Sequence, residues 1–343
     1  WRASPTHAKL SKREELETAM KAVVYKKYGS PDVLHVAEVA KPKPKANELL
    51  VKVRAAEVTK ADCEMRSFDF QVKWFVLPLR LVIGITKPRF NILGGYFAGV
   101  VEDIGPDVTK YKVGDAIFGG TGMGFGAHGE YVCVSQDKTL ALMPAGCSFE
   151  QAAAVPLGGL NALHFMRMAN IKAGEKVLIN GAGGSIGQLA LQIAKDMGAN
   201  VSVVDSGHKE AMLREIGVTQ FFDYTREDFT KSGQTFDVIF DMVPKSSFSD
   251  CVKMLNPKGR YIIGNPRLSD MIRCVITTRT TDKIARFAFA KETIEELETL
   301  KTMLAEGRIT SVIDKVFPLE SAAEAHHLVE TEQRLGMVIL AMP

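Results

Sequence analysis

A glycine-rich turn between an apolar strand and a helix is the clearest chemical feature of the sequence. The strand spans 176–180, and the turn consists of Gly181, Ala182, Gly183, Gly184, Ser185, Ile186 and Gly187. Glycines let the backbone come close to a phosphate, and the N-terminus of the following helix offers free N–H groups to the anion. Strict G-x-G-x-x-G spacing fails at Ile186, so the pattern rests on Gly181, Gly184 and Gly187. A purely structural turn is the alternative.

An acid at the end of the next strand favours dinucleotide binding over that alternative. Asp205 ends the strand over 200–205, where a carboxylate that accepts the ribose hydroxyl is expected. Asp205 favours NAD. Four nearby residues offer hydrogen-bond donors and charge to the extra phosphate of NADP, and on balance favour NADP(H): Ser206, His208, Lys209 and Tyr224. Gly264 and Asn265, at the end of the strand predicted over 260–264, are added to the predicted cofactor site.

Composition limits the classes of protein to consider. The 343 residues suggest two domains, and 46% hydrophobic with 24% charged residues is typical of a folded globular chain. Lys plus Arg number 43 against 40 Asp plus Glu, a net charge of +3 that predicts neither a nucleic-acid nor a membrane partner. The apolar stretch 74–85 is too short to span a bilayer. Five scattered cysteines without a CxxC pair favour a reducing cytoplasm.

Three regions differ in their predicted secondary structure. Residues 20–144 show short strands punctuated by Gly and Pro, which predicts an antiparallel, barrel-like unit. Residues 145–310 alternate strand and helix, which predicts a doubly wound parallel sheet of the α/β class. Residues 311–343 are expected to return to the first domain and complete it. Residues 1–19 are interpreted as an N-terminal extension.

Several motifs in consecutive order resemble the medium-chain dehydrogenase/reductase superfamily, most closely its zinc-free quinone oxidoreductase-like branch. The resemblance covers about residues 20–343, and its motifs lie at 20–23, 58–62, 97–101, 113–115, 129–131, 153–156 and 181–187. It implies a GroES-like β domain followed by a Rossmann domain.

The resemblance also implies that no zinc is bound. Zinc alcohol dehydrogenases of this superfamily carry a catalytic Cys where this chain has Thr59, and a His-Glu pair after a Gly where it has Gly94-Gly95-Tyr96. The four-cysteine lobe expected near 118–130 is also missing. Zinc needs three or four N, S or O ligands in fixed geometry.

Members of the zinc-free branch reduce quinones, enones or related conjugated carbonyls with a nicotinamide cofactor. By resemblance, Thr59 replaces an Asn that lines the nicotinamide pocket, and Asn161 replaces a Thr on the helix beneath it. The predicted catalytic donors to the developing oxyanion are Thr59, Lys60 and Tyr96, with His128 a further candidate. Asp62 is interpreted as a helix N-cap. Residues 66–93 are interpreted as an apolar loop that covers the small-molecule carbonyl substrate.

Two other functions remain open. One is a zinc-free alcohol dehydrogenase or carbonyl reductase, and the other a catalytically silent NADPH-binding protein. The near alternation over 283–290 predicts an edge strand of the Rossmann sheet, through which relatives form homodimers. An exposed apolar edge otherwise invites aggregation.

Overall fold

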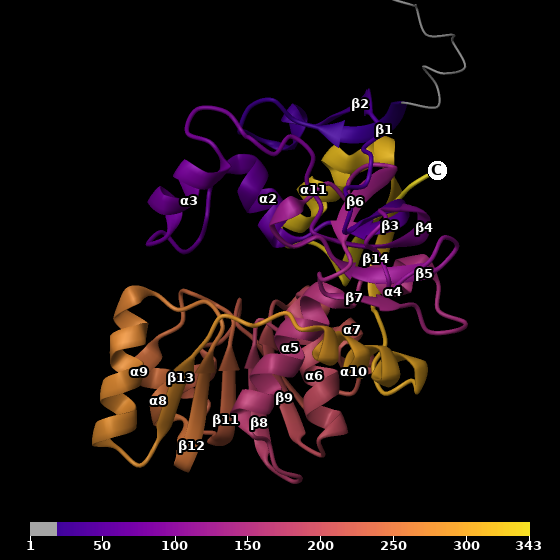
Figure 1. Ribbon diagram of the computed structural model, residues 1–343. Helices are drawn as coiled ribbons and strands as arrows, with labels where there is room; N and C mark the ends of the chain where they lie inside the picture. The colour runs from indigo at the N-terminus through magenta and orange to yellow at the C-terminus, as the bar shows by residue number, and fades with distance from the viewer. Residues whose placement is uncertain (1–18) are drawn as a thin grey trace, which may run out of the picture.

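The chain folds into two units, shown one above the other in Figure 1, a computed structural model that describes residues 19–343. The predicted extension lies outside the described residues except for Ala19. That residue begins β1 (Ala19–Val24), which pairs antiparallel with β2 (His35–Ala40). Five short 3-10 segments span Pro31–Val33, Gly122–Gly124, Gly207–Lys209, Phe229–Lys231 and Leu319–Ser321.

The upper unit is built on a seven-stranded sheet that combines strands from both ends of the chain. Its order is β14 (Ile313–Pro318), β15 (Met337–Ala341), β3 (Glu48–Glu57), β4 (Tyr96–Ile104), β5 (Ala116–Gly120) and β7 (Leu140–Leu142), while β6 (Tyr131–Ser135) pairs with β3. The C-terminal strand β15 lies antiparallel to β3. Residues from both ends of the sequence, such as Val53, Phe97 and Leu340, are fully buried in one shared core.

Four helices accompany this sheet: α2 (Lys60–Ser67), α3 (Val76–Ile83), α4 (Phe149–Ala153) and α11 (Ala322–Glu330). The interpretation of 66–93 as a loop was wrong in part, because eight of these residues form α3. An apolar run of that length, interrupted by Pro78, has no clear period, so its pattern does not distinguish a short helix from a loop.

The lower unit contains a six-stranded sheet in which every pairing is parallel. Its order is β10 (Gln220–Asp223), β9 (Asn200–Asp205), β8 (Lys176–Asn180), β11 (Phe236–Asp241), β12 (Leu255–Ile263) and β13 (Ile284–Phe287). This is the doubly wound order of two mononucleotide-binding halves. Its topological switch point lies between β8 and β11, where such sheets bind ligands beyond the carboxyl ends of the strands.

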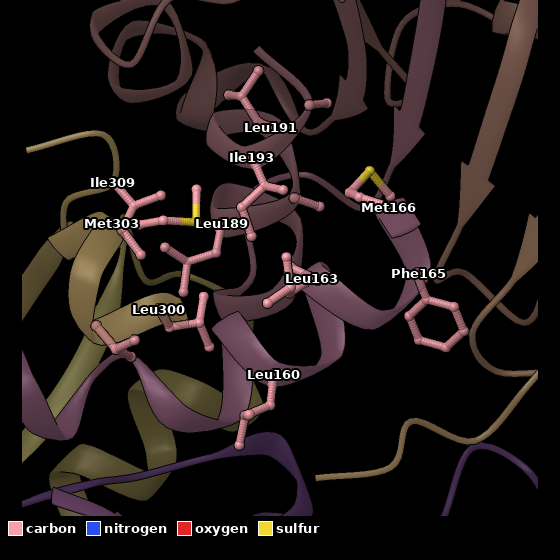
Figure 2. Close-up of a cluster of buried hydrophobic side chains, with 14 of the residues drawn as sticks. Leu160, Leu163, Phe165, Met166, Leu189, Leu191, Ile193, Leu300, Met303 and Ile309 are labelled. Atoms are coloured by element: carbon pink, nitrogen blue, oxygen red, sulfur yellow. The ribbon is translucent and has the colours of Figure 1, made fainter. Parts of the chain in front are cut away.

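Helices cover both faces of the parallel sheet: α5 (Pro156–Ala169), α6 (Ser185–Asp196), α7 (Glu210–Glu215), α8 (Phe248–Lys253), α9 (Leu268–Thr280) and α10 (Ile294–Ala305). Figure 2 shows the core between three of them, with Leu163 of α5, Leu189 of α6 and Leu300 of α10 gathered together. A Cβ atom on Gly158 would lie 2.5 Å from the Ser185 carbonyl oxygen, so glycine lets α5 pack directly against the start of α6.

Candidate cofactor and active site

Each of the three spaced glycines in the phosphate turn has a separate role. Gly181 has φ +88°, a conformation that L side chains rarely adopt. Gly184 is the N-cap of α6 in extended conformation. A Cβ on Gly187 would lie 2.3 Å from the carbonyl oxygen of Gly181, so this residue lets the helix pack on the strand. The turn therefore presents the N-terminus of α6 at the carboxyl end of β8, beside the switch point.

Both oxygens of the Asp205 carboxylate already accept hydrogen bonds from the backbone, one of them from the phosphate turn. One of its oxygens accepts from the Gly183 N–H at 2.6 Å, and the other accepts from the Ser206 N–H at 2.8 Å. The Lys209 ammonium lies 3.4 Å from the second oxygen, and its side chain is 5% exposed. Asp205 therefore braces the turn, and its negative charge is balanced by a buried lysine.

Glu57, at the end of β3, reaches across to the same turn from the upper unit. One carboxyl oxygen accepts from the Ser185 hydroxyl at 2.5 Å, and the other is buried with no hydrogen-bond partner among the described residues. Burial raises the pKa of Glu57 to about 8, against the opposing effects of Ser185 and Arg334. Sequence reasoning missed this residue, although an acid inside the apolar run 55–58 was a usable signal.

Arg334, on the segment that precedes β15, places a buried guanidinium against the phosphate turn. Its side chain is 5% exposed, and one terminal nitrogen lies 3.7 Å from where a Cβ on Gly184 would stand. Its Nε and the other terminal nitrogen have no hydrogen-bond partner in the part of the chain that the structure describes. Buried cations with unused donors are costly unless a ligand satisfies them. No local motif marked Arg334 as a functional residue.

A single carboxylate, Glu332, lies among three cations from both units. It lies 3.0 Å from Lys60, 3.9 Å from Lys209 and 4.0 Å from Arg334. Lys60 also donates to the Glu330 carbonyl at 3.2 Å. Three cations thus gather near the turn, and each could contact a phosphate of a bound cofactor.

Of the predicted catalytic residues, Thr59 holds the start of α2. Its hydroxyl donates to Asp62 Oδ2 at 2.6 Å and accepts from the Asp62 N–H at 3.1 Å. The interpretation of Asp62 as the N-cap was wrong, because Thr59 is the N-cap and Asp62 is the third helical residue of a capping box. Asp62 also accepts from the Gly94 N–H at 3.0 Å, which ties α2 to the segment before β4.

Tyr96, the aromatic residue among the predicted catalytic residues, forms a partly buried pair with Glu292 from the segment before α10. The Tyr96 hydroxyl donates a short hydrogen bond to Glu292. Burial is the main cause that raises the pKa of both groups, and the neighbouring carboxyl raises that of Tyr96 further. The Tyr96 hydroxyl therefore stays protonated, and the pKa of Glu292 lies above its ordinary value. Sequence reasoning missed Glu292.

A second cluster of buried polar side chains consists of His128, His326 and Cys63. His128 is fully buried, with Nε2 3.3 Å from the Glu57 carbonyl oxygen, and its ring meets that of His326 edge to face. Cys63 lies 3.6 Å from the His326 ring, and burial raises the pKa of its thiol to about 12. A thiol with such a pKa is a poor nucleophile, so this group is packed core.

The remaining predicted cofactor residues lie at or near the carboxyl edge of the parallel sheet. Asn161 donates to the Leu157 carbonyl at 2.9 Å. Asn265 follows β12 and donates to the Met242 carbonyl at 3.0 Å, and a Cβ on Gly264 would lie 2.2 Å from the Met242 sulfur. Tyr224 follows β10 and is exposed. Ile186 is half-buried and packs on the core of the parallel-sheet unit.

Comparison with known proteins decides the family. Residues 45–145 match a family described as alcohol dehydrogenase GroES-like domain, and residues 216–340 one described as zinc-binding dehydrogenase. The chain is 30% identical to a quinone oxidoreductase of Sus scrofa, over 94% of this chain and 98% of the relative. This chain belongs to the medium-chain dehydrogenase/reductase superfamily.

Two further similarities agree with that placement. The chain is 29% identical to an NADPH-dependent alkenal/one oxidoreductase of Arabidopsis thaliana, over 94% of this chain and 79% of the relative. The solved quinone oxidoreductase from Coxiella burnetii superposes with a TM-score of 0.83 at 28% identity, over 95% of this chain and all of that one. This superfamily member is therefore an oxidoreductase with a GroES-like domain and a Rossmann-like sheet.

The description of the family that matches residues 216–340 mentions zinc. Within residues 19–343, no group of three or more His, Cys, Asp or Glu side chains is placed to hold a metal. None of the helices over the same residues is long and apolar enough to cross a membrane.

Proposed function

We propose that this enzyme reduces quinones, enones or related conjugated carbonyls with NADPH. Arg334 carries the proposal, because one terminal nitrogen of its buried guanidinium lies beside the N-terminus of α6, and a cofactor phosphate there would accept hydrogen bonds from that guanidinium. The names of two relatives, quinone oxidoreductase and alkenal/one oxidoreductase, support this substrate class.

NADP(H) is favoured over NAD(H) because Asp205 has little capacity left for a ribose. Both of its oxygens already accept backbone N–H groups, and Lys209 balances its charge. An engaged, neutralised carboxylate repels a 2′-phosphate less than a free one does. A relative whose name specifies NADPH supports the same choice.

The bound cofactor would supply a hydride, so the protein must position the substrate and provide a proton. Among the three predicted catalytic residues, Tyr96 fits the role of proton donor, with Glu292 as the group that restores its proton. Thr59 and Lys60 fit positioning roles, because Thr59 starts α2 and Lys60 pairs with Glu332 across the units. The hydride would add to one carbon, and Tyr96 would protonate the reduced oxygen or the adjacent carbon.

Titration of the chelator-treated protein with NADPH and NADH tests the proposal, followed by turnover with a panel of quinones and enones. Saturable NADPH binding that raises the melting temperature, with turnover of a panel member, is the expected result. Binding without turnover would instead favour a silent nucleotide-binding protein. Turnover restricted to simple ketones or alcohols would favour the alcohol dehydrogenase alternative.

Replacing Tyr96 with phenylalanine is expected to lower kcat on the order of a hundredfold, with little change in KM, because the proton donor is lost. The pH dependence of kcat should change in Tyr96→Phe and in Glu292→Gln. Tyr111→Phe is the matched control, because this tyrosine hydroxyl donates only to the Leu140 carbonyl at 2.9 Å. A Tyr96→Phe variant with the wild-type kcat and pH profile would remove Tyr96 from the mechanism.

We also propose a homodimer, formed through α9 rather than by direct strand pairing. β13 is an edge strand, as expected, but the Thr278 hydroxyl donates to the Ala285 carbonyl at 3.0 Å and accepts from its N–H at 2.9 Å. The exposed apolar stripe of α9 beside that edge consists of Leu268, Ile272, Val275 and Ile276. Large exposed apolar patches of this kind mark interfaces.

Ile272→Glu is expected to weaken dimerisation at least about a hundredfold, because the 63% exposed side chain of Ile272 lies within the stripe. Sedimentation velocity over a concentration series would measure the change. Thr280→Glu, at an exposed position on the same helix, is the control. A wild-type protein that stays monomeric at high concentration would refute the dimer.

A further inference from the structure

Helix α3 carries apolar side chains on two opposite faces, but the protein covers only one of them. Val76, Leu79 and Ile83 pack on the core of the upper unit. On the outer face, Leu77 is 75% exposed and Leu81 is 58% exposed, and Ile85, just beyond the C-terminal end of the helix, is 59% exposed. A helix that is hydrophobic all round is normally buried on all sides. The outer face of α3 therefore lacks an apolar partner within the described chain.

The outer face is firmly held in place. The Arg80 guanidinium stacks 4.0 Å from the Phe68 ring centroid and 4.9 Å from that of Tyr28. The Tyr28 hydroxyl donates to the Gly84 carbonyl at 2.8 Å and lies 3.2 Å from that of Ile83. These contacts hold the middle and the C-terminal end of the helix against the upper unit. Figure 1 shows α3 at the outer edge of the upper unit, well away from the sheet.

The charged residues of the segment that contains α3 are all of one sign. Between Phe70 and Val101 the sequence holds four basic residues and no acidic one: Lys73, Arg80, Lys87 and Arg89. Lys73 pairs with Asp69, just before this run. Lys87 and Arg89 are exposed and form no ion pair within residues 19–343. The near-neutral balance of the whole chain hides this local excess of positive charge.

We propose that α3 docks the protein onto an anionic phospholipid surface. The outer leucines would enter the boundary of the acyl chains while Lys87 and Arg89 contact lipid phosphates, as in interfacial amphipathic helices. Trp74, at the start of the apolar run, is 40% exposed and suits the headgroup level of such an interface. This local docking revises the expectation of no membrane partner, which rested on net charge alone. It does not depend on the proposed activity.

Trp74 gives a site-specific test, because the only other tryptophan is Trp1. In a Trp1→Phe background, fluorescence is recorded with phosphatidylcholine vesicles and with vesicles containing phosphatidylglycerol. We expect a blue shift and co-sedimentation only with the anionic vesicles, both weakened by added salt. Absence of binding to the anionic vesicles would overturn the proposal.

Two sets of variants separate the apolar and charged parts of the surface. Leu77→Ser with Leu81→Ser should reduce vesicle partitioning on the order of tenfold or more, because both buried apolar groups are lost. Lys87→Gln with Arg89→Gln should reduce it on the order of fivefold per charge. Leu142→Ser is the control, since Leu142 is also exposed but lies on β7.

Three other outcomes would each refute lipid docking. Vesicle binding that the α3 variants leave unchanged would place the lipid contact elsewhere. Self-association lost in Leu77→Ser/Leu81→Ser, without vesicle binding, would identify the α3 surface as a contact between copies of this chain. A rise in KM for apolar substrates in these variants, again without vesicle binding, would identify α3 as a cover of the substrate site.

Discussion

Replacing Arg334 with methionine is expected to weaken NADPH binding about a hundredfold, a loss of about 3 kcal/mol. The guanidinium is buried beside Gly184, and its Nε and one terminal nitrogen have no hydrogen-bond partner within residues 19–343. A phosphate bound at the N-terminus of α6 would accept hydrogen bonds from this guanidinium. Charge-assisted hydrogen bonds in a site shielded from water are stronger than exposed ones.

Fluorescence titration with NADPH measures this loss, and circular dichroism with a melting curve shows whether the variant is folded. Arg334→Lys retains the positive charge but loses the planar guanidinium that can donate two hydrogen bonds to one phosphate. This variant should therefore recover only part of the affinity. Arg308→Met is the matched control, because Arg308 pairs with Asp196 and Glu306 on the surface. If folded Arg334→Met binds NADPH as tightly as wild type does, the cofactor phosphates do not contact Arg334.

Glu57→Gln is expected to remove a pH dependence of NADPH binding that wild type shows above pH 8. Burial raises the pKa of Glu57 to about 8, so the carboxyl is largely neutral at pH 7. A bound phosphate nearby would raise that pKa further, because it disfavours a second negative charge. Binding above pH 8 must then take up a proton, and affinity should fall by up to tenfold per pH unit. The Gln side chain is neutral throughout.

The same residue predicts a change in stability with pH. Because the folded state raises the Glu57 pKa from 4.5 to about 8, the folded protein binds more protons than the unfolded one between these values. The contribution of Glu57 to stability is therefore present below pH 4.5 and lost as pH rises toward 8. Glu57→Gln should gain on the order of 2 to 4 kcal/mol in the free energy of unfolding relative to wild type from pH 5 to pH 8.

NADPH titrations from pH 7 to 9.5 and urea unfolding at pH 5 and 8 test both effects. Glu296→Gln is the control, because Glu296 is a buried carboxylate of α10 near His164 and Arg167. Its binding profile should match that of wild type. A Glu57→Gln variant with an unchanged pH profile for both binding and unfolding would show that Glu57 does not titrate in this range.

The sequence by itself determined the features that depend on local spacing. The phosphate turn follows from glycines at 181, 184 and 187, because each meets a local backbone requirement near the strand–helix junction. The buried face of α6 follows from helical periodicity, and the parallel sheet from alternating strands and helices. These signals act within a few residues and need no knowledge of distant contacts.

The tertiary structure alone decided which charged groups surround the turn. Glu57 and Ser185 are 128 residues apart in the sequence, and Tyr96 and Glu292 are 196 apart. Arg334 reaches Gly184 only because β15 returns to pair with β3. Sequence periodicity reports whether a residue is buried on its own element, but not which element packs against it. A buried charge therefore acquires its partner, its pKa and its role only when the two units meet.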